Sequence, residues 1–178
     1  MFVFAYGSLI WRPGFPYLAA HPAILRGYHR RFCLWSRHYR GTPESPGLVL
    51  GLDRGGSCHG IAFEVAEGEA EAVLDYLDRR ENPLGEAVYH RRLLPVTLRD
   101  GRRVAAFAYV ADRTHPAYAR PGLEAAAEAI ARGHGQAGSN RDYLFNTLRH
   151  LRAHGLRDRG LERLAAQLSA AGPAAGHD

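Results

Sequence analysis

The chain has 178 residues, of which 46% are hydrophobic and 23% charged, a composition typical of a folded protein with its own apolar core. We therefore expect one domain over residues 1–178, with the last ~8 residues, rich in Ala, Gly and Pro, as a flexible tail. All 23 basic residues are arginine, which excludes a P-loop lysine, a Schiff-base nucleophile and a pyridoxal attachment site. The formal net charge of +5 favours an anionic small substrate, because arginine binds carboxylates bidentately.

Two features of the sequence bear on location. No apolar run approaches the 18 or so residues that a membrane span needs, and the first residues lack the basic region of a signal peptide. We expect a cytoplasmic protein without membrane contact. Cys33 and Cys58 form no CxxC pair; one disulfide would satisfy the count, but the cytoplasm favours free thiols.

The first third of the chain predicts strands. Residues 2–6 (FVFAY) are typical of a buried strand, and residues 26–35 predict a second one, in which aromatic and apolar side chains alternate with arginines. The proline-containing segment 40–47 predicts a loop. Residues 47–53 and 59–65 then predict a hairpin across RGGSC.

The rest of the chain predicts a helix, a hairpin and then mostly helices. Residues 68–81 predict a helix, and residues 88–98 and 102–112 predict a hairpin with its turn at Asp100 and Gly101. Further helices are expected over 122–132, ending at Gly133, over 139–154, beginning at Ser139 with Asp142 three residues later, and over 158–170. Strands that precede helices in this way indicate the α+β class.

An acid lies where the helix over 68–81 predicts an apolar side chain. Four residues beyond Leu77, or seven beyond Leu74, the apolar stripe reaches Glu81. Pro83 disfavours helical geometry at the residue before it, so the helix should end at Glu81. Burial and the negative end of the helix dipole would both raise the pKa of this carboxyl. A proton-transfer role and a structural ion pair with Arg79, Arg80 or Arg92 both remain open from this pattern.

Several stretches together resemble a known family. They are YGSLIW (6–11) with FPY (15–17), RRFCLWS (30–36) with RGTPESPGLVLGLD (40–53), YLDRRE (76–81) and GQAGSNRDYLFNTL (135–148). In this order they resemble the ChaC family of γ-glutamylcyclotransferases, which act on glutathione. The resemblance extends from Val3 to about Leu151. The YGSL stretch is shared across the wider superfamily, whereas its combination with RGTPExPG and GxxGxNxxYL is specific to the ChaC branch.

The resemblance implies a small mixed β-barrel with flanking helices and a helical C-terminal part. It implies cleavage of a γ-glutamyl amide to 5-oxoproline and an amine, which for glutathione is cysteinylglycine, without metal or cofactor. The family's acid/base maps onto Glu81, and a substrate-binding tyrosine maps onto Tyr143. The backbone that cradles the γ-glutamyl group maps onto Tyr6, Gly7, Ser8 and Leu9. Consecutive N–H groups at such a turn form an anion-binding nest.

One segment departs from the pattern. After Glu81, eight residues (NPLGEAVY) lead to Tyr89, whereas some relatives reach a tyrosine over a shorter glycine-rich link. Tyr89 is carried over as a further substrate-binding residue on this basis. The longer link could change access to the site or its substrate preference.

Other functions are less well supported by the sequence. His150 and His154 have the spacing of a zinc-binding HExxH helix but lack its glutamate. Arginine pairs and a pI of about 9.6 would suit RNA, but no RNA-binding signature accompanies them. Within the enzyme class, a cyclotransferase for other γ-glutamyl amides or γ-glutamyl amino acids remains the alternative to a glutathione enzyme.

Overall fold

The structure is a computed structural model that describes residues 1–82, 85 and 87–170. The predicted tail, residues 171–178, lies outside these residues, as do positions 83, 84 and 86 of the link before Tyr89. No helix in the described part of the chain is both long and apolar enough to cross a membrane.

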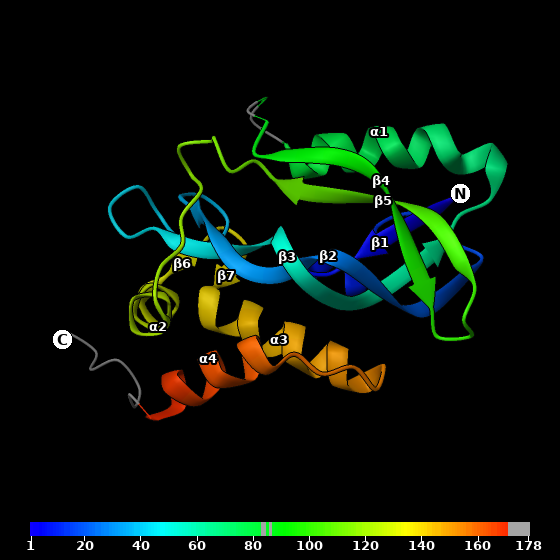
Figure 1. Cartoon of the computed structure of the whole chain (residues 1–178). Coiled ribbons are helices and arrows are strands. Elements are labelled where there is room, and N and C mark those ends of the chain that lie inside the picture. The colour runs from blue at the N-terminus through cyan, green and yellow to red at the C-terminus, as the bar shows by residue number, and fades with distance from the viewer. Residues whose placement is uncertain (83–84, 86, 171–178) are drawn as a thin grey trace.

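Five strands form a closed barrel (Figure 1). They are β1 (Phe2–Ala5), β2 (Ala19–Ser36), β3 (Gly47–Glu64), β4 (Tyr89–Leu98) and β5 (Arg103–Ala111), in the order β1-β3-β2-β4-β5. Most neighbours are antiparallel, but β1 pairs with β5 in parallel and closes the ring. The predicted α+β class and mixed barrel are confirmed.

The hairpin predicted across RGGSC is wrong. Residues 47–64 form the single long strand β3, which pairs with β2 along its whole length. Gly55 and Gly56 have φ values of +95° and +69°, and the register with β2 shifts between Arg26 and Tyr28. The glycines therefore bend the strand at an irregularity instead of reversing the chain, and the same local pattern fits either outcome. Strand β2 is correspondingly longer than predicted.

The other predicted elements are confirmed within a residue or two. A 3₁₀ turn, η2 (Glu67–Glu69), leads into α1 (Ala70–Glu81), and Gly101 turns the β4–β5 hairpin with φ +91°. Helices α2 (Leu123–Arg132), α3 (Asn140–Ala153) and α4 (Arg159–Ala170) follow. The Ser139 side chain caps α3 by accepting a hydrogen bond from the amide of Asp142, at 3.0 Å. The short strands β6 (His134–Gly135) and β7 (Gly138–Ser139) separate α2 from α3.

The turn that follows β1, here called the N-terminal turn, lies between the barrel and the helices. In Figure 1, α2, α3 and α4 gather on one side of the barrel, and α1 lies along β4 and β5 on the other. Strand β1 leads directly into the 3₁₀ turn η1 (Ser8–Ile10), which contacts α3. The turn therefore lies where the barrel, α1 and α3 can all reach it.

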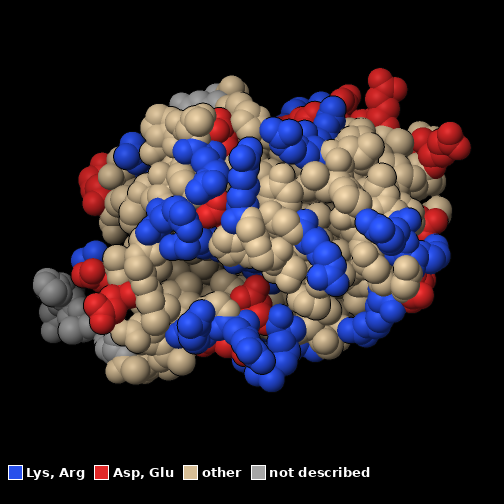
Figure 2. All heavy atoms as spheres, in the orientation of Figure 1, with Lys and Arg blue, Asp and Glu red and all other residues tan. Residues whose placement is uncertain are grey.

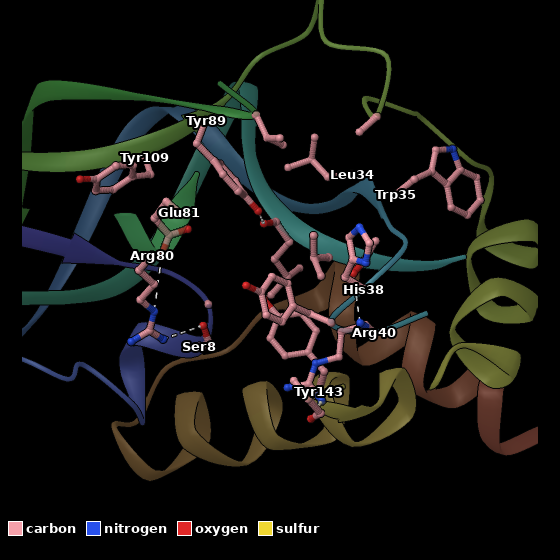
Figure 3. A pocket seen from close by; sticks show the side chains of 18 of the residues that line it. Ser8, Leu34, Trp35, His38, Arg40, Arg80, Glu81, Tyr89, Tyr109 and Tyr143 are labelled. Carbon is pink, nitrogen blue, oxygen red and sulfur yellow. Dashed lines mark hydrogen bonds and ion pairs between the residues drawn. The ribbon is translucent and has the colours of Figure 1, made fainter. Parts of the chain in front are cut away.

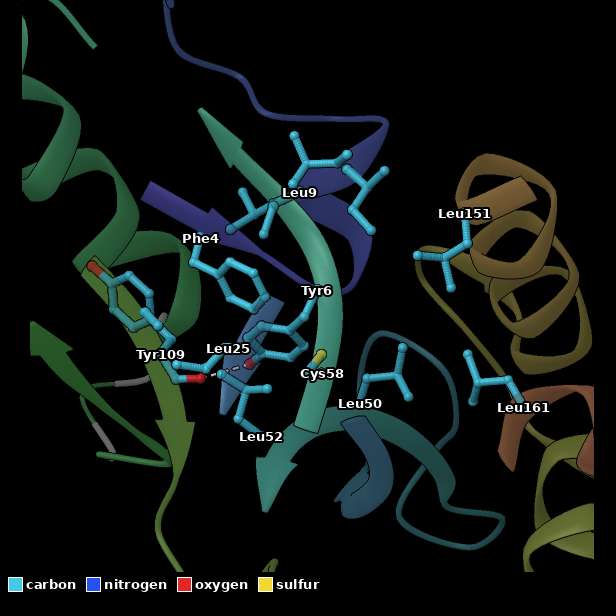
Figure 4. Packing of buried hydrophobic residues seen from close by; sticks show 14 of the residues in the cluster. Phe4, Tyr6, Leu9, Leu25, Leu50, Leu52, Cys58, Tyr109, Leu151 and Leu161 are labelled. Atoms are coloured by element: carbon cyan, nitrogen blue, oxygen red, sulfur yellow. Dashed lines mark hydrogen bonds between the residues drawn. The ribbon is translucent and has the colours of Figure 1, made fainter. Parts of the chain in front are cut away.

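The core fills the barrel and the space under the late helices (Figure 4). Phe4, Leu25 and Leu52 are almost completely buried inside, and Leu151 of α3 and Leu161 of α4 complete the cluster toward the helices. Both cysteines are buried and free. The free energy gained by removing this apolar surface from water, about 25 cal/mol for each Å², fixes the positions of the elements that carry the site.

Candidate active site

A cavity of about 790 Å³ opens at the end of the barrel, between η1, α1, β4 and α3. Figure 3 shows Glu81 and Tyr89 entering it from one side and Tyr143 from the opposite side. Every residue that the sequence singled out for the site lines this one cavity, although the chain separates them widely: Tyr6, Gly7, Ser8, Leu9, Glu81, Tyr89 and Tyr143.

Glu81 is the last residue of α1 and its side chain is 16% exposed. It continues the stripe of Val73 and Leu77, both of which are buried, as the periodicity predicts. Burial raises the pKa of its carboxyl from 4.5 to about 7, and the nearby Arg80 opposes that rise. The two groups are 3.8 Å apart (Nε to Oε1), too far for a hydrogen bond, so burial outweighs the ion pair.

The guanidinium of Arg80 instead ties α1 to the N-terminal turn. Its Nη1 donates to the carbonyl oxygens of Arg12 and Pro13 at 2.6 and 3.2 Å, and to the hydroxyl of Tyr76 at 2.8 Å. Its Nη2 donates to the Ser8 hydroxyl at 3.2 Å (Figure 3). Because Arg80 is adjacent to Glu81, these bonds fix the carboxyl relative to the turn. The sequence pattern indicates Arg80 only as a possible ion-pair partner of Glu81, and it contains no signal for these bonds to the turn.

The turn after β1 presents backbone donors to the cavity. The amide of Ile10 donates to the Gly7 carbonyl at 3.0 Å, and that of Arg12 donates to the Ser8 carbonyl at 2.9 Å. Within the described residues, no group accepts a hydrogen bond from the amides of Gly7, Ser8 or Leu9. All three residues line the cavity. Buried N–H groups need a partner, and consecutive ones suit an anion.

Tyr143, on α3, lies in the cavity wall across from Glu81 and Tyr89 (Figure 3). Burial and then the nearby Glu81 raise the pKa of its hydroxyl to about 12, so the hydroxyl stays protonated near neutral pH. Its ring packs edge-on against Phe32, at 5.8 Å between centroids, and lies 4.9 Å from the guanidinium carbon of Arg40. Tyr143 therefore offers the cavity a hydrogen-bond donor in a fixed position.

Gly7 allows this approach, because a Cβ at that position would lie 3.1 Å from the Tyr143 hydroxyl oxygen. We expect Gly7→Ala to displace the hydroxyl by a few tenths of an ångström and to lower turnover of a γ-glutamyl substrate by about tenfold. Steady-state kinetics on the folded variant would measure the loss. Gly68→Ala is the matched control, because nothing lies within 4 Å of a Cβ there. Activity of Gly7→Ala equal to that of the control would contradict the prediction.

Tyr89 reaches the cavity despite the longer link that precedes it. Asn82, directly after α1, donates through Nδ2 to the Tyr89 carbonyl at 3.2 Å and accepts from the Tyr89 amide at 3.1 Å. This pair of bonds joins the two ends of the link. The Tyr89 hydroxyl donates to the Leu50 carbonyl at 2.8 Å, and burial raises its pKa well above the ordinary value. Tyr89 therefore belongs to the cavity wall.

The cavity is strongly basic. Glu81 is the one carboxylate among the described residues that line it, and the lining also contains five arginines: Arg12, Arg37, Arg40, Arg79 and Arg80. Arg40 belongs to the predicted loop 40–47, and its place in the RGTPESPG stretch was the available signal for it. On the face shown in Figure 2, arginines are scattered among acidic side chains. This face therefore has no continuous basic stripe of the kind that is typical of nucleic-acid-binding surfaces.

A metal site is not visible in the described part of the chain, where no group of three or more His, Cys, Asp or Glu side chains could hold an ion. His150, one of the two histidines with zinc-like spacing, stacks on Trp11 with 5.4 Å between ring centroids. Trp11 lines the cavity. His150 therefore supports the cavity wall from behind.

Comparison of this chain with known proteins finds relatives whose names agree with one another. The glutathione-specific γ-glutamylcyclotransferase of Escherichia coli K12 is 35% identical over 165 residues, which cover 92% of this chain and 71% of that protein. The human glutathione-specific γ-glutamylcyclotransferase 1 is 33% identical over 180 residues, covering 97% and 78%. The crystal structure of a yeast γ-glutamylcyclotransferase specific to glutathione shares the fold, with a TM-score of 0.86 at 24% identity over 96% of each chain. The sequence profile of the ChaC-like proteins matches residues 1–171, and this chain therefore belongs to the ChaC-like family.

Proposed function

We propose that this protein is a γ-glutamylcyclotransferase that converts glutathione to 5-oxoproline and cysteinylglycine. The observation that carries the proposal is the shared cavity of Glu81, whose pKa is raised to about 7, and the unpaired amides that begin at Gly7. An acid of that pKa can both take and return a proton near neutral pH. The E. coli and human relatives are named for the same activity on glutathione.

The proposed reaction is an intramolecular acyl transfer. The α-amine of the γ-glutamyl group attacks its own γ-carbonyl carbon, a C–N bond closes the five-membered lactam, and the amide bond to the peptide breaks. Glu81 accepts the proton that the amine loses and returns it to the departing nitrogen. Because both reacting groups belong to one molecule, holding the reactive rotamer supplies much of the rate. No atom changes oxidation state in this reaction, so it needs no redox cofactor, and the proton transfers are assigned to Glu81 alone.

The cavity has groups for the rest of the substrate. The amides of Gly7, Ser8 and Leu9 would bind the α-carboxylate of the γ-glutamyl group. The protonated hydroxyl of Tyr143, which lies close to Gly7, would donate to the γ-carbonyl oxygen as negative charge develops there. Tyr89 would close the wall beside Glu81.

The charge of the cavity favours a γ-glutamyl compound with an anionic leaving half, such as glutathione, over compounds whose leaving half is neutral or cationic. Glutathione carries a second carboxylate on its leaving half, and the lining holds five arginines against one carboxylate. Arg37, the residue directly after β2, is exposed and lines the cavity. A leaving half without that carboxylate, or with a cationic side chain, would lose this attraction.

The substrate assignment is tested by incubating the purified protein with glutathione, γ-glutamyl-alanine and γ-glutamyl-lysine side by side and quantifying 5-oxoproline. We expect glutathione to give the highest kcat/KM, with γ-glutamyl-lysine at least about tenfold lower, the equivalent of one charge-assisted contact. Glu81→Gln, assayed in parallel, controls for contaminating activity. Faster release from γ-glutamyl-alanine or γ-glutamyl-lysine would shift the assignment to a cyclotransferase for other γ-glutamyl compounds.

We also propose that the protein works in the cytoplasm on a small-molecule substrate, without a nucleic-acid or membrane partner. Cys33 and Cys58 are both free thiols, the state that a reducing compartment maintains.

A further inference from the structure

A charged residue lies buried behind the turn that begins at Gly7. Arg30, on β2, has a side chain with no exposed surface. Its Nε donates to the carbonyl oxygen of Tyr6, its Nη2 donates to that of His59 at 2.5 Å, and its Nη1 pairs with Asp158 at 2.6 Å. Neither Arg30 nor Asp158 lines the cavity. Of the three residues to which the guanidinium donates, Tyr6 is the one that lines the cavity.

The geometry of the Tyr6–Gly7 peptide bond connects the Arg30 contact with the cavity. The described backbone has no cis peptide bond, so the C=O of Tyr6 and the N–H of Gly7, which share one planar peptide, point in opposite directions. Because the carbonyl points to Arg30, the Gly7 N–H points away from it, and Gly7 lines the cavity. A charged donor on the carbonyl also polarises the peptide and strengthens its N–H as a donor.

Arg30 also affects the cavity electrostatically. Its charge lowers the pKa of the Tyr143 hydroxyl, against the much larger effect of burial, so its field reaches the part of the cavity wall beside Gly7. An ion pair with a fully buried member seldom adds net stability compared with apolar residues of the same size, because the buried charge, here that of Arg30, loses its hydration. We therefore expect the pair of Arg30 with Asp158 to have a role in addition to fixing the start of α4, where Asp158 accepts from the Leu161 amide.

We propose that Arg30 is a positioning residue, which holds the Tyr6–Gly7 peptide so that the Gly7 N–H donates to the α-carboxylate of the γ-glutamyl group. The inference rests on the proposed function and adds a residue to it. Arg30 does not touch the substrate; it acts through the peptide.

The test compares glutathione with an analogue whose glutamyl α-carboxylate is replaced by a carboxamide. The ratio of the two kcat/KM values measures the preference for the carboxylate. In Arg30→Met/Asp158→Asn, which removes the guanidinium without leaving an unpaired carboxylate, we expect this preference to fall about tenfold, mainly through KM for glutathione. General destabilisation would lower both kcat/KM values equally and leave the ratio unchanged.

Asp158→Asn alone is the matched control. It breaks the ion pair, keeps a carbonyl oxygen to accept from the amide of Leu161 at the start of α4, and leaves the Arg30–Tyr6 bond. Its carboxylate preference should stay within about twofold of wild type, since the peptide contact is intact. If the double variant does not fold, Arg30→Lys takes its place and should lower the ratio about threefold, because one ammonium replaces the guanidinium fork.

The role of Arg30 would be overturned if the ratio of the two kcat/KM values were unchanged in the variants that lack the guanidinium. It would also be overturned if the ratio fell equally in Asp158→Asn. In both cases the wild type would still turn over glutathione, so the proposed function would stand. A wild type that releases no 5-oxoproline from glutathione would overturn the proposed function itself, and this inference with it.

Discussion

Replacing Glu81 by glutamine should lower kcat for glutathione by roughly 10²- to 10⁴-fold, the range for one general acid/base, while the protein still folds. Glutamine has the shape of the protonated acid and fits the same place at the end of α1, but it cannot take a proton from the substrate amine. The loss should appear in kcat more than in KM, because proton transfer is needed only in the transition state. Release of 5-oxoproline under saturating glutathione measures it.

Glu71→Gln is the matched control for this substitution. Glu71 lies in the first turn of the same helix and is exposed, outside the cavity. The control should retain wild-type turnover. Turnover of Glu81→Gln within threefold of wild type would remove Glu81 from the acid/base role.

The same substitution should stabilise the protein at pH 8. The folded-state pKa of Glu81, about 7, lies above the ordinary value of 4.5, so the folded state holds the proton more tightly than the unfolded state. The free energy of unfolding therefore falls as pH rises between about 4.5 and 7, in total by about 3 kcal/mol, and both states are protonated below that window. Glu81→Gln lacks this penalty. Its unfolding free energy relative to wild type should rise by about this amount from pH 4 to pH 8.

Urea unfolding of both proteins at pH 4 and pH 8 measures the effect, and Glu71→Gln should follow the wild type at both values. A gain for Glu81→Gln that is equal at the two pH values would reflect packing or propensity instead of ionisation. No gain at pH 8 would mean that the Glu81 carboxylate is well solvated in the folded protein. A stabilised but inactive variant is the combination expected of an acid held in a dry site for chemistry.

Local patterns predicted most elements of this fold, because those patterns have one structural solution. The stripe of Val73 and Leu77 suits only a helix with one buried face, and Ser139 with Asp142 suits a helix start. The glycine pair at 55–56 has two solutions, a turn or an irregular strand. Pairing of β3 with β2, up to 45 residues away (Ala19 with Glu64), selects the strand. No local signal contains that choice.

The same distinction, between what local patterns determine and what tertiary contacts determine, applies to the candidate site. The sequence by itself determined the position of Glu81 on the apolar face of a helix that ends there, and the residues by which the chain resembles its family, because periodicity and motifs are properties of neighbouring residues. Only the tertiary structure decided that Glu81, Gly7 and Tyr143 share one cavity, and that burial outweighs Arg80 in setting the pKa of Glu81. Desolvation depends on the atoms that surround a group, and these come from segments that only the closed barrel and its helices bring together.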